Sequence, residues 1–462
     1  MNFFTPLVNQ SINRSREATL SILGIHDSGL RQHIAEQMSD TLGQEGCFLA
    51  APVFEHTFGW KPAGRTLQSL EGSVLSNSLV KNLSKAKGYE LQAPYEHQLK
   101  AWETLKELPP KSVVITSGTG SGKTECFMVP ILDDLICEYE NGAWGEPKIM
   151  PYGPLPITPA NMTFNYGQAC FEGMKAYKDE NDEVFLFRPE KNFARINKSA
   201  KRLAMPEIPE HVFMDGLKAL IDIDRNWVPK GEGKSLYIRP LIFATEETLK
   251  ARISTKYMFA IVTSPAQMYY AEPVSVKVSE HYSRSAEGGV GFAKAAGNYA
   301  GSFYPTQLAN DEGYDQLIWT DDATHTKFEE SGTMNVFVRI GNTIKTPNTS
   351  EKILDGVTRD SFLKLAESKG YEVKVGDVLV EEVKEAAKNG TLKEAWGVGT
   401  AVVTTIFKQI AFGTEQFNLP ILSEEESYAL LLKKALVDIQ TNKAEDPFGW
   451  RVKVEKEILE TV

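Results

Sequence analysis

The chain has 462 residues, enough for roughly two to four domains, so a single small module is excluded. Hydrophobic residues make up 42% of the chain and charged residues 24%, a balance typical of a folded globular protein rather than a disordered one. The net charge is −11 at pH 7, and no dense block of Lys and Arg interrupts it. Binding to nucleic acid would need a local basic patch, which the sequence does not indicate.

Three features of the sequence indicate the cellular compartment: the cysteines, the apolar runs and the N-terminus. Cys47, Cys126, Cys137 and Cys170 form no C-x-x-C pair, so we expect no zinc ribbon or other metal site. Four cysteines in so long a chain suit a reducing compartment. No apolar run reaches the length of about 18 residues expected of a transmembrane helix, and the N-terminus does not read as a secretory signal. We therefore expect a cytoplasmic protein.

The first part of the chain reads as helices and loops around one short strand. Apolar residues at helical spacing predict a helix over 96–108, and VVI predicts a buried strand at 113–115. A glycine-rich turn follows, and the apolar stretch 127–136 predicts a further helix. In that helix Asp133 and Asp134 would lie on a solvated face.

The segment ITSGTGSGKT at 115–124 has the pattern of a nucleotide phosphate loop between a strand and a helix. Glycines let the backbone approach a phosphate, and the N–H groups at a helix N-terminus attract it. Lys123 would contact the β- and γ-phosphates, and Thr124 would hold Mg²⁺. The residues expected to contact nucleotide in this segment are Gly118, Gly120, Gly122, Lys123 and Thr124.

The motif PYEHQ at 94–98 resembles the adenine-reading glutamine motif of superfamily 2 helicases, with Gln98 as the reading residue. With the phosphate loop it resembles the start of a DEAD/DEAH-like helicase, which implies ATP-dependent work on nucleic acid. Hydrolysis also needs a second acidic motif, and no such run follows Thr124. Residues 1–140 carry more Asp and Glu than Lys and Arg, which is unfavourable for a nucleic-acid groove. We interpret 1–140 as a truncated helicase-like α/β fragment and expect no ATPase activity.

From about residue 141 short strands alternate with helices, which indicates an α/β (α+β) architecture. Strands are predicted at 183–188, 235–244, 257–263, 316–319 and 335–340. Helices are predicted at 190–203, 209–222, 359–369 and 424–441.

One cluster in this region, GGVGFAKAAGNYA at 288–300, places Lys294 among small residues. Lysine is the side chain that forms Schiff bases, and small neighbours let a flat ring lie close. Tyr299, five residues later, could hydrogen-bond a phenolate oxygen of that ring. A lysine in a loop is usually a surface residue, so the hypothesis that Lys294 forms a Schiff base depends on the small residues around it.

Three further clusters suit the same planar, phosphorylated cofactor. FEESGTMN at 328–335 places Glu330 before an apolar strand, where a carboxylate could pair with a protonated pyridine nitrogen or simply sit in a turn. LDGVTR at 354–359 opens a helix whose N–H groups could bind phosphate, unless Thr358 is a plain N-cap. GVGTA at 397–401 is a small-residue turn that could bring donors to an anion.

Together these clusters resemble the branched-chain amino acid aminotransferases, pyridoxal 5′-phosphate enzymes of fold type IV. The resemblance covers about 141–462 and includes KIMPYGPL, YGQ followed by FEGMKAY, FRP, ARINKSAKRLAMP and SLYIRP. It implies a small α/β domain at 141–268, an interdomain loop at 269–274 and a larger barrel-like domain at 275–462, with pyridoxal phosphate between the domains.

The resemblance also assigns roles to residues. Lys294 is expected to hold the cofactor as a Schiff base and to move a proton between the substrate Cα and the cofactor C4′. The expected cofactor contacts are Arg195, Lys294, Tyr299, Glu330, Val357, Thr358 and Thr400. The expected substrate contacts are Tyr166, Phe171, Tyr237, Arg239, Thr400 and Ala401. The implied reaction transfers the amino group between leucine, isoleucine or valine and 2-oxoglutarate, in a homodimer.

The chain departs from the family pattern at two places. The family's N-terminal arm, which supplies a strand ahead of segment 144–149, is expected to be missing because helicase-like sequence stands in its place. The redox cysteine pair after the Gly-Thr-Ala turn is absent, and Val402 to Thr405 stand there.

Three different interpretations compete with a branched-chain aminotransferase. A D-amino acid aminotransferase or an aminodeoxychorismate lyase of the same fold is disfavoured by Tyr237 and Arg239. An ATP-dependent nucleic-acid motor would use the phosphate loop. A gene rearrangement would leave the N-terminal half inert.

Overall fold

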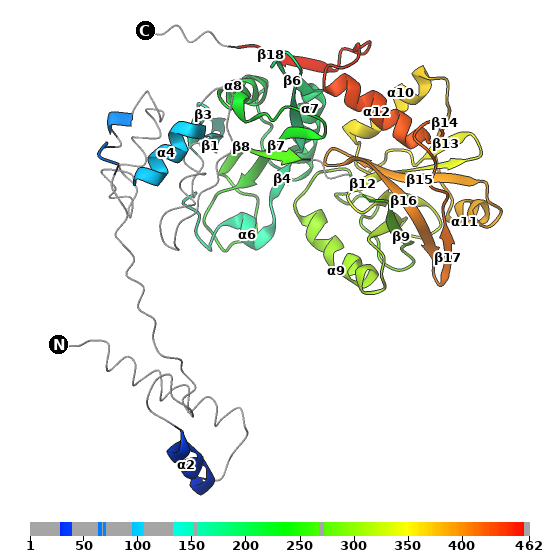
Figure 1. Ribbon diagram of the computed structural model, residues 1–462, viewed down its shortest axis with the longest axis horizontal. Coiled ribbons are helices and arrows are strands. Elements are labelled where there is room, and N and C mark those ends of the chain that lie inside the picture. Colours follow the sequence, from blue (N-terminus) through cyan, green and yellow to red (C-terminus); the bar gives the residue numbers. More distant parts are fainter. Residues whose placement is uncertain are drawn as a thin grey trace. The chain divides into compact units, whose positions relative to one another are not determined.

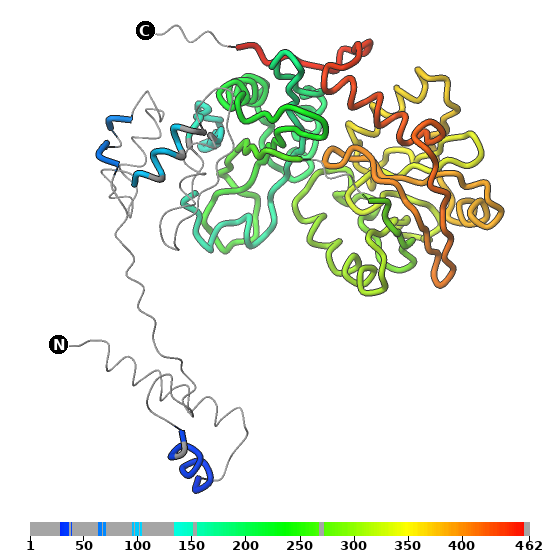
Figure 2. The backbone as a smooth tube through the Cα atoms, viewed as in Figure 1, coloured from blue at the N-terminus to red at the C-terminus, as the bar shows by residue number. Residues whose placement is uncertain are grey.

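The structure, a computed structural model, describes most of the chain from residue 133 onward and short stretches before it (Figures 1 and 2). The described residues are 28–38, 63–66, 68–70, 95–105, 133–151, 155–267 and 272–456. The chain divides into two units, Met1–Lys61 and Pro62–Val462, which we describe separately. The phosphate-loop motif at 115–124 and the strand predicted at 113–115 lie outside the described residues.

Short helical elements are described ahead of residue 133. They are α2 (Ser28–Gln37) in the first unit, and η1 (Gln68–Leu70) and α4 (Glu96–Leu105) in the second. The position of α4 confirms the helix predicted over 96–108 as far as the described residues reach. The apolar side chains of Leu99 and Trp102 in this helix are buried, as the helical spacing predicts. Of the described helices, none is long and apolar enough to cross a membrane.

A nine-stranded sheet forms the first lobe of the second unit. Its strands are β1 (Asp133–Glu140), β2 (Ala143–Trp144), β3 (Lys148–Pro151), β4 (Ala169–Phe171), β5 (Met174–Lys178), β6 (Val184–Phe187), β7 (Lys234–Ala244), β8 (Tyr257–Gln267) and β18 (Arg451–Val454). The order is β18-β6-β5-β7-β8-β1-β2, with β3 paired to β1 and β4 to β7. The helical elements of this lobe are α6 (Met162–Tyr166), α7 (Pro189–Arg202), η2 (His211–Asp215), α8 (Gly216–Ile223) and η3 (Arg225–Trp227).

Strand β1 corrects two predictions. The helix predicted over 127–136 is wrong in its described part, because Asp133–Glu140 is a strand that pairs antiparallel with β8. Leu135 and Cys137 are buried, whereas Ile136 between them is half-buried and Glu138 is exposed, as the period of two in a strand predicts. Asp134 is buried in this strand rather than on a solvated helix face. The sheet also begins ahead of the boundary predicted at 141, so a strand does precede segment 144–149.

The core of the first lobe lies between the sheet and helices α7 and α8. Ile196 of α7, Leu217 of α8 and Phe259 of β8 are fully buried there. Gly216 opens α8 against β1, and a Cβ at this position would lie 2.4 Å from Cδ1 of Leu135. This close packing fixes α8 on the sheet, and α7, which packs in the same core, supplies one of the site's charged residues.

A second nine-stranded sheet forms the second lobe. Its strands are β9 (Val274–Val278), β10 (Gln316–Thr320), β11 (Phe328–Ser331), β12 (Met334–Ile340), β13 (Thr343–Thr346), β14 (Glu372–Val375), β15 (Leu392–Gly399), β16 (Val403–Phe412) and β17 (Glu415–Asn418). The order is β11-β10-β9-β16-β15-β12-β13-β14, with β17 paired to β16. Because β11 also pairs with β12, these strands close into a barrel, as the resemblance implied. The helices are α9 (Gly297–Asp311), α10 (Val357–Ser368), α11 (Val380–Lys388) and α12 (Tyr428–Gln440), of which α10 and α12 pack together (Figure 1).

The two lobes share a core and an ion pair. Phe187 of the first lobe packs in one buried cluster with Phe362 and Trp396 of the second. The buried Arg188 pairs with Asp360 of α10 at 2.6 Å. Strand β18 returns the chain to β6, so the C-terminal part of the predicted large domain at 275–462 joins the first lobe's sheet. The joined lobes hold α7 and α10 in fixed positions beside the site.

Candidate active site

Lys294 lies in the loop before α9, and its backbone is held by the first lobe. Its N–H donates to Oγ of Ser199 at 2.9 Å, and its carbonyl accepts from the N–H of Phe171 at 3.1 Å. The neighbouring Ala293 and Ala295 are buried, which explains the small residues around the lysine in the sequence. The lysine is therefore fixed between α7 and β4 rather than free on a surface loop.

The Lys294 amine faces an aromatic and a phenolic side chain. Nζ lies 2.9 Å from Oη of Tyr299 and 5.1 Å from the centre of the Phe171 ring. Burial, and then the nearby Arg195 cation, lower the pKa of Lys294 to about 8. Burial raises the pKa of Tyr299, so that phenol stays protonated and able to donate. A lysine of this kind is partly neutral near physiological pH, as a nucleophile and base must be.

Arg195 of α7 is buried in a two-pronged ion pair that the sequence motifs do not reveal. Its Nε and Nη2 donate to Oε1 and Oε2 of Glu172, each at 2.7 Å. Its Nη1 donates to the carbonyl of Asp355 at 2.8 Å, just before α10. Burial opposes the charge on both partners, yet the pairing keeps the pKa of Arg195 raised and that of Glu172 lowered. The FEGMKAY motif contains Glu172, but nothing in its spacing points to a partner 23 residues away.

Val357 and Thr358 form the first turn of α10, next to the Arg195 contact. The N-cap is Gly356, so the alternative that Thr358 is the N-cap is wrong. Among the described residues no side chain caps this end, which leaves its N–H groups for an anion. A Cβ at Gly356 would lie 2.0 Å from Oδ1 of Asn335, so glycine is required there.

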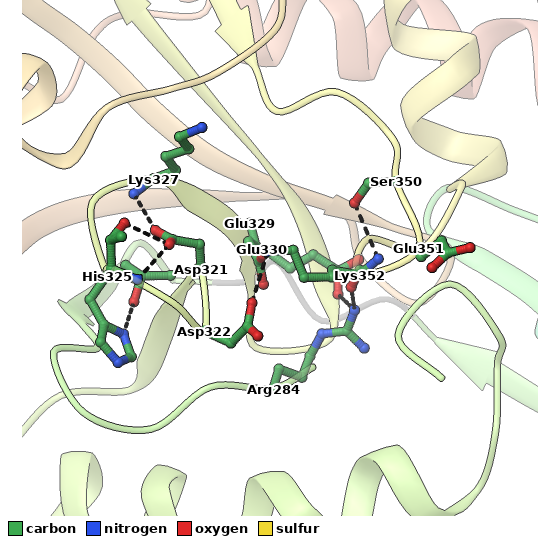
Figure 3. Close-up of polar contacts among 12 residues, drawn as sticks. Arg284, Asp321, Asp322, His325, Lys327, Glu329, Glu330, Ser350, Glu351 and Lys352 are labelled. Atoms are coloured by element: carbon green, nitrogen blue, oxygen red, sulfur yellow. Dashed lines mark hydrogen bonds and ion pairs between the residues drawn. The ribbon is translucent and has the colours of Figure 1, made fainter. Parts of the chain in front are cut away.

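Glu330 lies on β11 and is buried. Its Oε1 accepts from the N–H of Leu354 at 3.0 Å and from Nδ2 of Asn335 at 3.3 Å. Its Oε2 pairs with the guanidinium of Arg284 at 2.5 Å (Figure 3). Burial raises the pKa of Glu330, and Arg284 opposes that rise. Arg284 belongs to no sequence motif, so no role was predicted for it.

Three of the predicted substrate residues lie together across β4 and β7. Nη2 of Arg239 donates to Oη of Tyr237 at 2.7 Å, and the Arg239 guanidinium lies 4.4 Å from the centre of the Phe171 ring. Gly173 makes room for this group, since a Cβ there would lie 2.5 Å from the Tyr237 hydroxyl. Tyr166 is different: it is half exposed at the end of α6, and its hydroxyl donates to the Leu249 carbonyl.

Thr400 and Ala401 lie in the turn between β15 and β16. The carbonyl of Ala401 accepts from Nζ of the buried Lys175 at 2.7 Å. Burial, and then the cation of Lys433, lower the pKa of Lys175 to about 8. This second lysine was not predicted either, although it stands in the FEGMKAY motif.

A cavity open to solvent joins the main groups, with Arg284, Lys294, Tyr299 and Glu330 in its wall. An amine, a phenol and a carboxylate facing one space match the hydrogen-bonding partners that a pyridoxal ring needs. The structure therefore brings together Lys294, Tyr299 and Glu330 as predicted.

The residues predicted to bind nucleotide are described only in part. Those at 118–124 lie outside the described residues. Gln98 is buried, and its Oε1 accepts from the N–H of Tyr95 at 2.9 Å at the start of α4.

Two protein families match this sequence. The family described as Amino-transferase class IV matches residues 169–410, and DEAD/DEAH box helicase matches residues 95–149. The second match agrees with the resemblance of the N-terminal part to a helicase. It also runs into β1, which pairs with β8 in the first lobe.

Among curated relatives, a probable branched-chain-amino-acid aminotransferase of Staphylococcus epidermidis is 42% identical over 77% of this chain and 97% of its own length. Branched-chain-amino-acid transaminase 1 of Bacillus subtilis is 40% identical over 69% of this chain and 91% of its own length. A match to 77% of the chain takes in more residues than follow position 141, so it begins ahead of that position. The expectation that the N-terminal arm is missing is therefore wrong for at least its last part, which is β1.

Among solved structures, the branched-chain aminotransferase of Thermoproteus uzoniensis with norvaline matches with a TM-score of 0.57 and 21% identity. That of Escherichia coli matches with a TM-score of 0.56 and 22% identity. Each match covers 70% of this chain and 100% of the other chain. At these identities the matches establish the fold of the two joined lobes.

Proposed function

The chain belongs to the class IV aminotransferases, and from this premise we propose how its own residues transfer an amino group. It is a branched-chain amino acid aminotransferase that uses pyridoxal 5′-phosphate. It moves the amino group between L-leucine, L-isoleucine or L-valine and 2-oxoglutarate. The observation that carries the assignment of residues is the partly buried Lys294 amine, which lies 2.9 Å from the Tyr299 hydroxyl in a cavity that Glu330 also lines.

Lys294 is the catalytic residue of this proposal. When bound, pyridoxal phosphate supplies an electron sink that makes the substrate Cα–H acidic. Lys294 would hold the cofactor through its amine, and the same amine would take the proton from the substrate Cα. Its lowered pKa of about 8 supports this role, because a fully protonated lysine could not accept a proton. The hydroxyl of Tyr299 keeps the amine oriented and would face the cofactor's phenolate oxygen.

Charged and backbone groups on both lobes would hold the rest of the cofactor. The phosphate would lie at the N-terminus of α10, on the N–H groups of Val357 and Thr358, with Thr400 as a further donor. Arg195 supports this end because it is anchored to the Asp355 carbonyl, beside that N-terminus. Glu330 would face the pyridine nitrogen.

The substrate would lie on the other side of the cofactor. Phe171 and Tyr237 offer an apolar wall for a branched side chain, and Arg239 offers a cation for a carboxylate. Thr400 and Ala401 would meet the α-carboxylate. Tyr166, which is half exposed here, would contact substrate only at the outer edge of this pocket.

The test uses the visible absorbance of the purified protein loaded with pyridoxal phosphate. We expect the lysine-bound cofactor to absorb at long wavelength and the band to bleach on addition of L-leucine. Lys294→Ala should lack the band, while the matched control Lys175→Met should keep it. A Lys294→Ala spectrum identical to the wild type would contradict the assignment, and bleaching by D-leucine instead of L-leucine would favour a D-amino acid aminotransferase.

Further properties follow from the same assignment as proposals. We infer that the enzyme is a cytoplasmic homodimer and that nucleic acid is not its substrate. We place the small domain ahead of an interdomain loop near 269–274 and the barrel domain after it. An ATP-dependent role for the N-terminal part is not favoured, since the motifs that hydrolysis needs beyond the phosphate loop are absent from the sequence.

A further inference from the structure

Two adjacent glutamates on β11 each pair with a different, partly buried cation. Glu329 and Glu330 are both almost fully buried. Oε1 of Glu329 lies 3.1 Å from Nζ of Lys352, whose amine also reaches Asp322 at 2.9 Å. Oε2 of Glu330 lies 2.5 Å from the guanidinium of Arg284 (Figure 3). Because successive side chains on a strand point to opposite faces, the two ion pairs are separate. Of these two pairs, the Arg284 pair lines the cofactor cavity.

Backbone carbonyls fix the direction of the Arg284 guanidinium. Its Nη2 donates to the carbonyl of Lys352 at 2.6 Å and to that of Gly291 at 3.2 Å. Gly291 is required at this point, since a Cβ there would lie 2.4 Å from the Lys352 carbonyl oxygen. The arginine side chain is only 10% exposed, so water screens its charge little.

The environment of Glu330 otherwise disfavours a carboxylate. Burial raises its pKa, and the cation that opposes this most is Arg284, ahead of Lys294 and Arg195. Lys294 is partly neutral and Arg195 is already paired with Glu172. Arg284 is therefore the dedicated counter-ion of Glu330.

We propose that Arg284 is a positioning residue that keeps Glu330 ionised and aimed into the cavity, and thereby keeps the cofactor's pyridine nitrogen protonated. The proposal rests on the proposed function, in which Glu330 faces that nitrogen. A carboxylate stabilises a protonated pyridine, whereas a neutral carboxylic acid does not. Loss of Arg284 should thus weaken the electron sink without touching the substrate pocket.

The test reads the nitrogen directly, by the ¹⁵N chemical shift of ¹⁵N-labelled pyridoxal phosphate bound to the full-length enzyme. Glu330→Gln and Arg284→Gln should both move the shift towards that of an unprotonated pyridine, and Arg284→Lys should restore it. Lys352→Gln, which removes the neighbouring, partly buried cation, is the matched control and should leave the shift unchanged. In Arg284→Gln we also expect kcat to fall about 10- to 100-fold, the usual effect of removing a group that orients a site's ligand, with KM nearly unchanged.

The outcomes separate the two proposals. If Glu330→Gln leaves the nitrogen shift unchanged, the assigned role of Glu330 is wrong. If Glu330→Gln moves the shift but Arg284→Gln does not, or Lys352→Gln moves it equally, the proposal for Arg284 is overturned. Should Arg284→Gln fail to bind cofactor, the pH titration of Arg284→Lys decides. In that variant the pyridine nitrogen of the bound cofactor should lose its proton at lower pH than in the wild type, because lysine can deprotonate and arginine cannot. Identical titrations of the two proteins would overturn the proposal.

Discussion

Lys294, which is partly buried, and Lys175, which is buried, are two lysines with a lowered pKa of about 8 in two different regions of the molecule. Lys294 opens onto a cavity beside Tyr299 and near the Glu172–Arg195 pair. Lys175 instead donates to the carbonyl of Ala401 under the turn between β15 and β16. The contrast teaches that a lowered pKa alone does not make a catalytic lysine. Access to a cavity and a partner that orients the amine decide the role.

The largest expected difference between the two lysines is in turnover. Lys294→Ala should lower kcat for L-leucine on the order of 10⁴-fold, because it removes the proton carrier. Lys175→Met should leave kcat within a small factor of the wild type. Steady-state assays of 2-oxo acid formation measure both. Equal losses of kcat in the two variants would contradict the claim that Lys294, and not Lys175, is the catalytic lysine.

The ion pair of Glu172 with Arg195 should affect both the folding stability of the protein and the pKa of Lys294. Glu172→Gln leaves the buried Arg195 without its counter-ion, which should destabilise the protein by about 3–5 kcal/mol. The freed cation should also lower the pKa of Lys294 further and leave that of Lys175 unchanged. Chemical denaturation measures the first effect, with Asp438→Asn in the exposed pair Lys434–Asp438 as the control that should change nothing measurable. A Glu172→Gln protein as stable as the wild type would contradict this account.

The pH dependence of cofactor attachment should follow Lys294. Its folded-state pKa is lowered to about 8, so the amine is protonated and unreactive below that pH and neutral above it. The attachment rate of pyridoxal phosphate to apoprotein should rise about tenfold per pH unit below pH 8 and level off above it. Stopped-flow absorbance measures this. A rate still rising steeply to pH 10 would show an ordinary, unshifted lysine.

A smaller effect is expected at the Lys175 turn. Lys175→Met removes one hydrogen bond that holds Ala401, so the carboxylate-binding turn should loosen. The KM for L-leucine should rise about two- to tenfold, as the loss of one hydrogen bond implies, with the cofactor band retained. An unchanged KM would mean that the turn holds its place without the lysine.

The smallest effect is expected at Lys123, in the phosphate-loop motif. Lys123→Ala should leave aminotransferase turnover unchanged, because the proposed catalytic and binding groups all lie from residue 166 onward. Phosphate release from ATP should stay at background in both proteins. ATP hydrolysis that disappears in Lys123→Ala would support a nucleic-acid motor.

The sequence predicted several strands of both lobes from their apolar patterns, and it predicted the main site residues from short motifs. The predicted strands at 183–188, 235–244 and 335–340 correspond to β6, β7 and β12. Lys294, Tyr299 and Glu330 stand in motifs whose residue types suit one cofactor. The prediction for β1 failed because a short apolar run fits a helix and a strand equally well.

The partners of the site residues could not be predicted in the same way. Glu172 reaches Arg195 only because α7 packs against β4 in the first lobe, and Arg284 reaches Glu330 only through the folding of the second lobe. Neither ion pair has a short, regular spacing along the chain from which it could be predicted. Long-range charge pairs are set by tertiary structure, which a single sequence does not display.

The central claim is that Lys294, and no other lysine, bonds to the cofactor. The most direct measurement is borohydride reduction of the protein loaded with pyridoxal phosphate, followed by peptide mass spectrometry. We expect the pyridoxyl group on the peptide that contains Lys294, with none on Lys175 or Lys123. Its stoichiometric recovery on a different lysine, or its absence from every peptide, would contradict the account.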